Sequence, residues 1–123
     1  MRPNIFTTYF ARLRNMDNVD PIAIVRYPPK WYKGRVYQTL APNPDILLDY
    51  KYSDSDWQKF EKKYKEQLEC LDPEEVLNDL KTLNNGKDIV LVCFEKDSEH
   101  CHRSICAKWL SDNLGICVSE LQV

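Results

Sequence analysis

The sequence has no apolar run long enough to cross a bilayer and no secretory leader. Its longest apolar stretches, residues 89–94 and 21–25, are far shorter than a membrane span of about 20 residues. The opening residues MRPNIFTTYF contain neither the long apolar core nor the small-residue cleavage site of a secretory signal. We therefore expect no membrane partner and a cytoplasmic location.

A strong excess of charge is also missing, because the formal net charge is −2 and the pI is about 5.7. This balance creates no global field that would draw the chain onto a phosphate backbone, so a nucleic-acid partner is not expected. Local basic clusters can still hold a small anion. They are Arg12 with Arg14, and Arg26 with Lys30, Lys33 and Arg35.

Internal repeats and low-complexity segments are absent too. A length of 123 residues with 43% hydrophobic and 29% charged content suits one globular domain spanning residues 1–123. The five cysteines form an odd number. In a chain without an export signal, reduced cytoplasmic thiols are the simplest interpretation, and we expect no disulfide.

Strands and helices are predicted to alternate along the chain. Apolar and β-branched runs predict strands at NIFTTYF, PIAIVRY, DIVLVCF and ICVSEL. Helical periodicity predicts helices from Asp54 onward, in LDPEEVLNDLKTLNNG and in SICAKWLSDNL, with a short helical turn at ARLRNM. The segment PPKWYKGRVYQTLAPNPD, rich in proline, is predicted to be a structured loop with at most a short strand at RVYQTL. The alternation predicts an α/β fold, in which three layers surround a small, mainly parallel sheet with DIVLVCF at its centre.

The carboxyl edge of such a sheet is where ligands bind, just outside the strand ends. Tyr9 and Arg26 lie near the ends of the first two predicted strands, and residues 95–103 follow the third. If the strands are parallel, these residues share one edge of the sheet.

The segment CFEKDSEHCHRS contains candidate metal ligands in Cys93, His100, Cys101 and His102. Three of these residues are consecutive and cannot all converge on one ion, unlike the separated ligand pairs of structural zinc sites. We therefore expect no metal site, and no cofactor is expected either.

Three other interpretations of this segment stay open. Cys101 is predicted to lie in the first turn of a helix, where the helix dipole and Arg103 lower the pKa of a thiol and favour a nucleophile. The helix start, with Arg103 and His102, can instead hold an anion. In the third interpretation Cys101 packs in the core, and Arg103 pairs with Glu95 or Glu99. A phosphatase loop does not fit, because no glycine separates a cysteine from an arginine at the required spacing.

The same residues resemble the segment that identifies domain-of-unknown-function family 488, found in bacteria, archaea and phages. In that family a strand ending in Cys-x-Glu leads to Cys-His-Arg at a helix start. FTTYF, IAIVRYPPKWYKG and YQTLAP extend the resemblance in the same order along the chain. It implies a compact Rossmann-like α/β domain, in the host cytoplasm if a phage encodes it. The motif positions carried over are Cys93, Glu95, Cys101, His102 and Arg103, together with Thr8, Tyr9, Arg26, Pro28, Lys30, Trp31 and Tyr32.

The leading functional hypothesis is binding of a small phosphorylated molecule, a nucleotide or nucleotide-derived ligand, at the carboxyl edge of the sheet. Arg103, His102 and the helix start would hold the phosphate, and Arg26 and Lys30 would add charge. Trp31, Tyr32 or Tyr9 would stack on the ligand, and Thr8 belongs to the same predicted site. If the ligand is turned over, Cys101 is the nucleophile, His102 the base and Glu95 the acid or the orienting group. The alternatives are a non-enzymatic module that sequesters a nucleotide signal or docks a protein, and an accessory to nucleic-acid processing.

Overall fold

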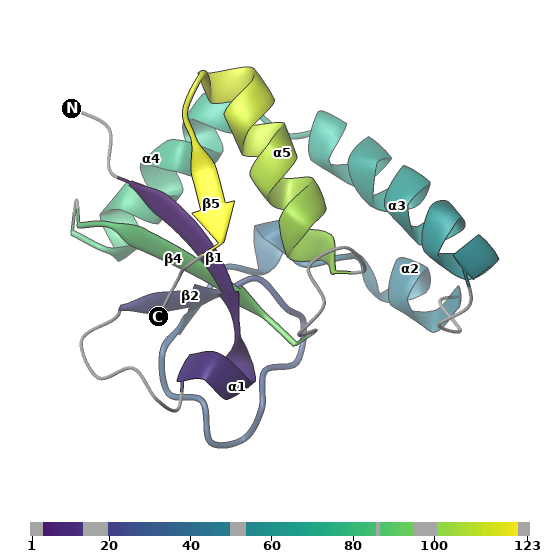
Figure 1. The fold of residues 1–123 in the computed structure, drawn as a ribbon, viewed down its shortest axis with the longest axis horizontal. Coiled ribbons are helices and arrows are strands. Elements are labelled where there is room, and N and C mark those ends of the chain that lie inside the picture. Colours follow the sequence, from purple (N-terminus) through teal and green to yellow (C-terminus); the bar gives the residue numbers. More distant parts are fainter. Residues whose placement is uncertain (1–3, 14–19, 50–53, 86, 95–100, 121–123) are drawn as a thin grey trace.

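The computed structural model describes residues 4–13, 20–49, 54–85, 87–94 and 101–120. Its sheet consists of five parallel strands in the order β3-β2-β4-β1-β5 (Figure 1). The strands are β1 (Ile5–Tyr9), β2 (Pro21–Ala23), β3 (Arg35–Val36), β4 (Ile89–Cys93) and β5 (Val118–Glu120). The sequence prediction of a mainly parallel sheet is confirmed. So is the central place of DIVLVCF, because β4 lies in the middle and all five of its residues are buried.

The helices alternate with these strands. They are α1 (Phe10–Leu13), the 3-10 helix η1 (Gln38–Leu40), α2 (Pro44–Asp49), α3 (Asp54–Glu69), α4 (Pro73–Leu83) and α5 (His102–Leu114). The sequence placed the start of α5 two residues later, at Ser104, and assigned the first residues of α2 to a loop. None of the helices in the described ranges is long and apolar enough to cross a bilayer.

Helix ends follow local sequence chemistry. The side chain of Asp72 accepts a hydrogen bond from the backbone N–H of Glu74 at 3.0 Å and so caps α4, while Pro73 occupies the first helical position, where no N–H is needed. Helix α5 ends at Gly115, whose φ of 64° lies in the left-handed region that glycine adopts without strain. These signals were readable in the sequence and define where the connecting loops begin.

Two apolar layers cover the sheet, one on each face. The larger layer joins inward side chains of the strands, such as Ile22 and Leu91, to those of α3, α4 and α5, such as Leu68, Leu80 and Leu110. The smaller layer gathers Phe10, Ala23, Val25, Val90, Val92, Cys93 and Cys101, with Tyr32 packed against it. The sheet is thus flanked on both faces, in agreement with the predicted Rossmann-like sandwich, and Cys93 and Cys101 belong to the thinner layer.

Candidate functional site

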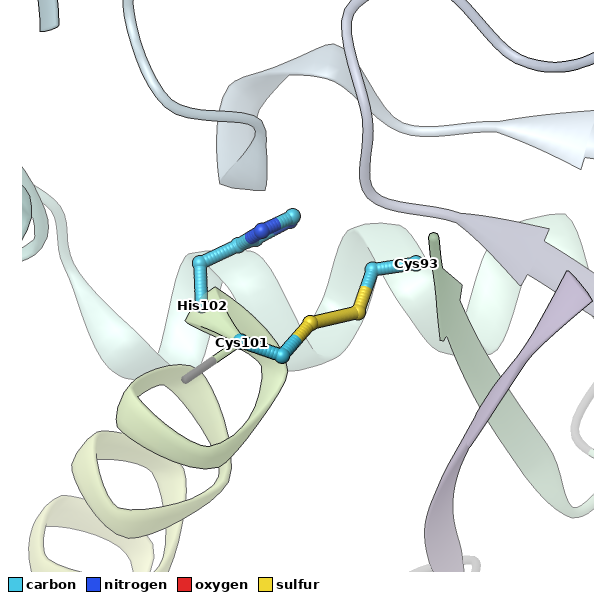
Figure 2. Close-up of side chains that lie close together, drawn as sticks. All are labelled: Cys93, Cys101 and His102. Atoms are coloured by element: carbon cyan, nitrogen blue, oxygen red, sulfur yellow. A yellow bond between two sulfur atoms is a disulfide. The ribbon is translucent and has the colours of Figure 1, made fainter. Parts of the chain in front are cut away.

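Cys93 and Cys101 meet at the carboxyl edge of the sheet. Cys93 is the last residue of β4, opposite Tyr9 at the end of β1, and Cys101 is the N-cap residue of α5. A disulfide joins the two, with their Cα atoms 7.4 Å apart (Figure 2). The expectation that all cysteines are reduced is therefore wrong for this pair. Cys93 ends β4 and Cys101 directly precedes α5, the next element of the chain. The two residues are eight positions apart in the sequence and become neighbours in the fold.

His102 lies beside the disulfide, and ligand atoms of Cys93, Cys101 and His102 all lie within 4.8 Å of one another. The sequence argument concerned all three consecutive residues, His100, Cys101 and His102, and His100 lies outside the described residues. The extended backbone of Cys101, with φ −128° and ψ 139°, precedes the first helical residue and lets both side chains reach the same region. Because the disulfide occupies both sulfurs, these residues could hold a soft cation only after reduction.

The imidazole of His102 is buried and held in one orientation. Its Nε2 lies 2.6 Å from the carbonyl oxygen of Ile24, to which the neutral ring donates, and its ring meets the ring of Tyr64 edge-on with 5.5 Å between centroids. Burial, with a smaller contribution from the nearby Arg103 and against the effect of the Ile24 hydrogen bond, lowers the pKa of His102 to about 4. His102 is therefore neutral at pH 7, and a role as base would fall to Nδ1.

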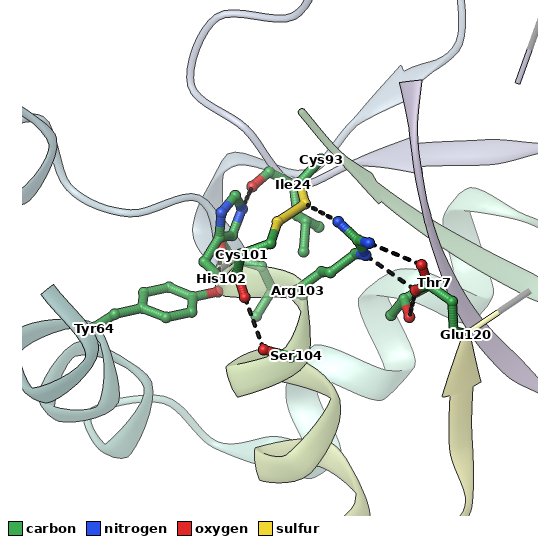
Figure 3. Close-up of a disulfide and its surroundings, with 10 residues drawn as sticks. Thr7, Ile24, Tyr64, Cys93, Cys101, His102, Arg103, Ser104 and Glu120 are labelled. Atoms are coloured by element: carbon green, nitrogen blue, oxygen red, sulfur yellow. Dashed lines mark hydrogen bonds and ion pairs between the residues drawn. A yellow bond between two sulfur atoms is a disulfide. The ribbon is translucent and has the colours of Figure 1, made fainter. Parts of the chain in front are cut away.

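Arg103 is completely buried and already has partners (Figure 3). Its Nε donates to Glu120 Oε1 at 3.0 Å, and Nη2 donates to Oε2 at 2.8 Å. Its Nη1 donates to the sulfur of Cys93 at 3.3 Å, and the guanidinium lies 5.6 Å from the centre of the Tyr9 ring. Thr7 Oγ1 donates to the same carboxylate at 2.7 Å. A phosphate could contact Arg103 only by sharing or replacing Glu120.

Glu120 and Thr7 are the site residues that sequence reasoning missed. One of the open interpretations of the sequence paired Arg103 with Glu95 or Glu99, both of which lie outside the described residues. Glu120 reaches Arg103 because β5 pairs with β1 at the sheet edge, with Glu120 opposite Thr7. No local pattern in ICVSEL signals that pairing.

The third cysteine of this region, Cys106, has no access to solvent. Burial raises the pKa of its thiol to about 12, although a hydrogen bond with Tyr64 lowers it in part. Burial also raises the pKa of Tyr64 well above its ordinary value, and the Tyr64 hydroxyl donates to the carbonyl oxygen of Leu40 at 2.5 Å. Cys106 and Tyr64 thus serve as packing beneath His102.

Trp31 and Tyr32, two of the aromatic residues predicted to bind the ligand, lie around Phe10 together with Phe94, which the sequence did not single out. Its ring centroid lies 6.1 Å from that of Trp31, 5.2 Å from that of Tyr32 and 4.9 Å from that of Phe94. Trp31 is 40% exposed and Phe94 is 50% exposed. Tyr32 is half-buried, and its hydroxyl lies 2.6 Å from the carbonyl oxygen of Arg35; burial raises its pKa to about 12. The exposed rings of Trp31 and Phe94 offer a stacking surface.

The remaining predicted site residues are spread along the same edge. Tyr9 lies between two guanidinium groups, those of Arg12 and Arg103. Thr8 is fully buried and its hydroxyl has no hydrogen-bond partner, and Lys30 is exposed. Arg26 lines a different hollow, together with side chains of η1 and α3. The predicted acid, Glu95, lies outside the described residues.

Comparison with known families identifies the family of this chain. The family model described as the active DUF488-N3 subclade, DUF488-N3a, matches residues 5–114, a range that runs from the start of β1 to the end of α5. Comparison with curated proteins and with solved structures gives no match.

Proposed function

The chain belongs to the DUF488 family, in its N3a subclade, and on this premise we propose that it binds a small phosphorylated molecule at the carboxyl edge of its sheet. A nucleotide or nucleotide-derived molecule is the proposed ligand, and the Cys101 thiol is the proposed nucleophile that acts on it, in the cytoplasm. Family membership agrees with the resemblance inferred from CFEKDSEHCHRS. The support for the function itself comes from the arrangement around Cys101.

The observation that carries the proposal is the position of the cysteine pair at a helix start beside a buried guanidinium. Cys101 caps α5, a helix of 13 residues, and Arg103 donates to the sulfur of Cys93. In a reducing cytoplasm the pair is expected to stand as two thiols. The partial positive charge of the helix start and the Arg103 guanidinium both favour a thiolate at this point.

The proposed step joins the Cys101 sulfur to the electrophilic atom of the ligand while the bond to the leaving group breaks. The leaving group departs with the electron pair, and water then cleaves the sulfur–ligand bond and restores the thiol. Arg103 is a positioning residue in this scheme, because Glu120 and Cys93 fix its guanidinium. The exposed rings of Trp31 and Phe94 would stack on the base or sugar.

The test follows products and binding in the reduced protein. A panel of nucleotides and sugar phosphates is incubated with wild type, with Cys101→Ser and with Cys117→Ser, an exposed cysteine distant in sequence from the pair. Products are measured by mass spectrometry and binding by calorimetry. We expect turnover by wild type and Cys117→Ser and none by Cys101→Ser. Full turnover by Cys101→Ser, or absence of binding to every panel member, contradicts the proposal.

A second candidate, a non-catalytic nucleotide-binding or protein-docking module, is favoured by the burial of both sulfur-bearing residues. Cys93 is 0% exposed and Cys101 is 1% exposed, as expected of packing residues. This module would bind the same ligands without consuming them. Binding of equal strength by wild type and Cys101→Ser, with no product from either, would select it over the thiol mechanism.

A further inference from the structure

A hollow of about 460 Å³ lies beside Arg26, formed by side chains of η1, the end of α3 and the segment that leads to α2. Its lining consists of Arg26, Gln38, Thr39, Asn43, Gln67, Cys70 and Leu71. The volume falls within the range of small-molecule sites. No residue of the cysteine site lines this hollow.

The lining of this hollow carries positive charge and no negative charge. Arg26 is the single charged residue among the lining side chains, and none of them is Asp or Glu. Among the described residues, Arg26 Nη2 donates hydrogen bonds to two main-chain carbonyl oxygens, those of Ala41 at 3.3 Å and Pro42 at 3.4 Å. Both acceptors are neutral carbonyls, so within the described part of the chain no anionic partner is assigned to this guanidinium.

One donor of this guanidinium is unused. Arg26 Nε is buried and has no hydrogen-bond partner among the described residues. A buried N–H without an acceptor is costly, and an oxygen of a bound anion removes that cost. Gln67, which also lines the hollow, donates to the Ala41 carbonyl at 2.8 Å and accepts from the Asn43 N–H at 3.0 Å. The hollow is therefore built before any ligand arrives.

From these observations we propose that the Arg26 hollow is a binding site for the phosphate group of a small molecule. The inference rests on the proposed function only for the identity of the ligand as a phosphorylated molecule. The sequence analysis grouped Arg26 with Lys30 and Trp31 in one predicted ligand site. In the structure Arg26 lines the hollow together with Gln38, Thr39 and Asn43.

Cys70 supplies a direct readout, because its exposed free thiol lines the hollow. Cys117 is also a free, exposed thiol, but it does not line the hollow and so serves as a control within the same molecule. Native protein is treated with iodoacetamide in the presence of inorganic phosphate, adenosine monophosphate, adenosine or acetate. Alkylation of each cysteine is then quantified by peptide mass spectrometry.

We expect adenosine monophosphate and phosphate to slow alkylation of Cys70 several-fold and to leave Cys117 unchanged, while adenosine has no effect. Equal protection by acetate would overturn the phosphate assignment, and protection by adenosine or by none of the four compounds would overturn the site. In Arg26→Lys, which keeps the charge but loses Nε as a donor, we expect protection to need an about tenfold higher ligand concentration. Arg35→Lys, outside the hollow, should behave as wild type.

The outcome separates this inference from the proposed function. If nucleotides are consumed in a Cys101-dependent reaction without protecting Cys70, the phosphate site in the Arg26 hollow is contradicted and the proposed function is supported. If they protect Cys70 and no turnover occurs, the hollow stands and the thiol mechanism fails.

Discussion

Two buried cysteines of the same helix region face different surroundings. Cys106 is enclosed by apolar residues and Tyr64, whereas Cys101 caps the helix close to Arg103 and is bonded to Cys93. Burial alone raises the pKa of a thiol, so the guanidinium and the helix start must account for any nucleophilic character of Cys101. Residue type alone could not have distinguished these cysteines.

Cys106 is expected to be the slowest of the free cysteines to react. Its pKa of about 12 leaves little thiolate at neutral pH, and its burial excludes the reagent. Cys70 and Cys117, by contrast, are exposed. Iodoacetamide should alkylate Cys106 in the folded protein about a hundredfold more slowly than Cys70 or Cys117. Unfolding in urea should abolish the difference, and equal rates in the folded protein would contradict the described burial.

His102 should make the stability depend on pH between about 6.5 and about 4. The folded pKa is lowered from 6.5, so the unfolded chain binds the proton first as the pH falls. The stabilisation is complete above pH 6.5 and is lost toward pH 4, by about 1.4 kcal/mol per pH unit. His102→Gln, which can still donate to Ile24, should lack this slope when urea unfolding is measured at several pH values. Equal slopes in the two proteins would contradict the assignment.

At the scale of elements, the ion pair of Arg103 and Glu120 joins α5 to the edge strand β5. Glu120→Gln would remove the carboxylate charge that faces Nε and Nη2 of the fully buried guanidinium. We expect a loss of about 2–3 kcal/mol in the free energy of unfolding, less than for a fully buried pair because the Glu120 side chain is partly exposed. Glu61→Gln, in the exposed pair with Lys65, is the matched control and should cost less than about 0.5 kcal/mol. Similar losses in urea unfolding of both variants would contradict the role of the Arg103 pair.

The loop after β2 depends on the ring of Tyr32 lying over Gly34. A Cβ on Gly34 would lie 2.6 Å from Cζ of that ring and would overlap its hydroxyl. The hydroxyl also lies within hydrogen-bond distance of the Pro21 and Arg35 carbonyl oxygens, which restricts movement of the ring. Gly34→Ala should therefore cost about 1–3 kcal/mol. In thermal or urea unfolding, the double variant with Tyr32→Phe should lose less than the sum of the two single losses. Strict additivity would contradict the overlap.

At the scale of the whole molecule, the sequence predicted the parts of the fold that depend on local patterns. The unbroken apolar run of β4 predicted the centre of the sheet, and Asp72 with Pro73 predicted the start of α4. Placing Tyr9 and Cys101 at one edge followed from parallel strands alone. These features needed no knowledge of long-range contacts.

The features that the sequence did not predict depend on which side chains the fold brings together. Glu120 meets Arg103 only because the last strand pairs with the first, which no local motif encodes. The disulfide was missed because the argument from compartment and cysteine count says nothing about which sulfurs are neighbours. That Arg26 lines a hollow with side chains of η1 and α3 likewise has no local signal in the sequence.

The central claim is that Cys101 is an activated thiol, and its ionisation tests that claim most directly. In the reduced protein, the rate of iodoacetamide alkylation of Cys101 and of exposed Cys117 is measured by peptide mass spectrometry from pH 5 to pH 10. Arg103 and the helix start both favour a thiolate, although Glu120 offsets part of the charge of Arg103, so we expect Cys101 to reach its half-maximal rate at a lower pH than Cys117. A half-maximal rate for Cys101 at or above that of Cys117 would contradict the account.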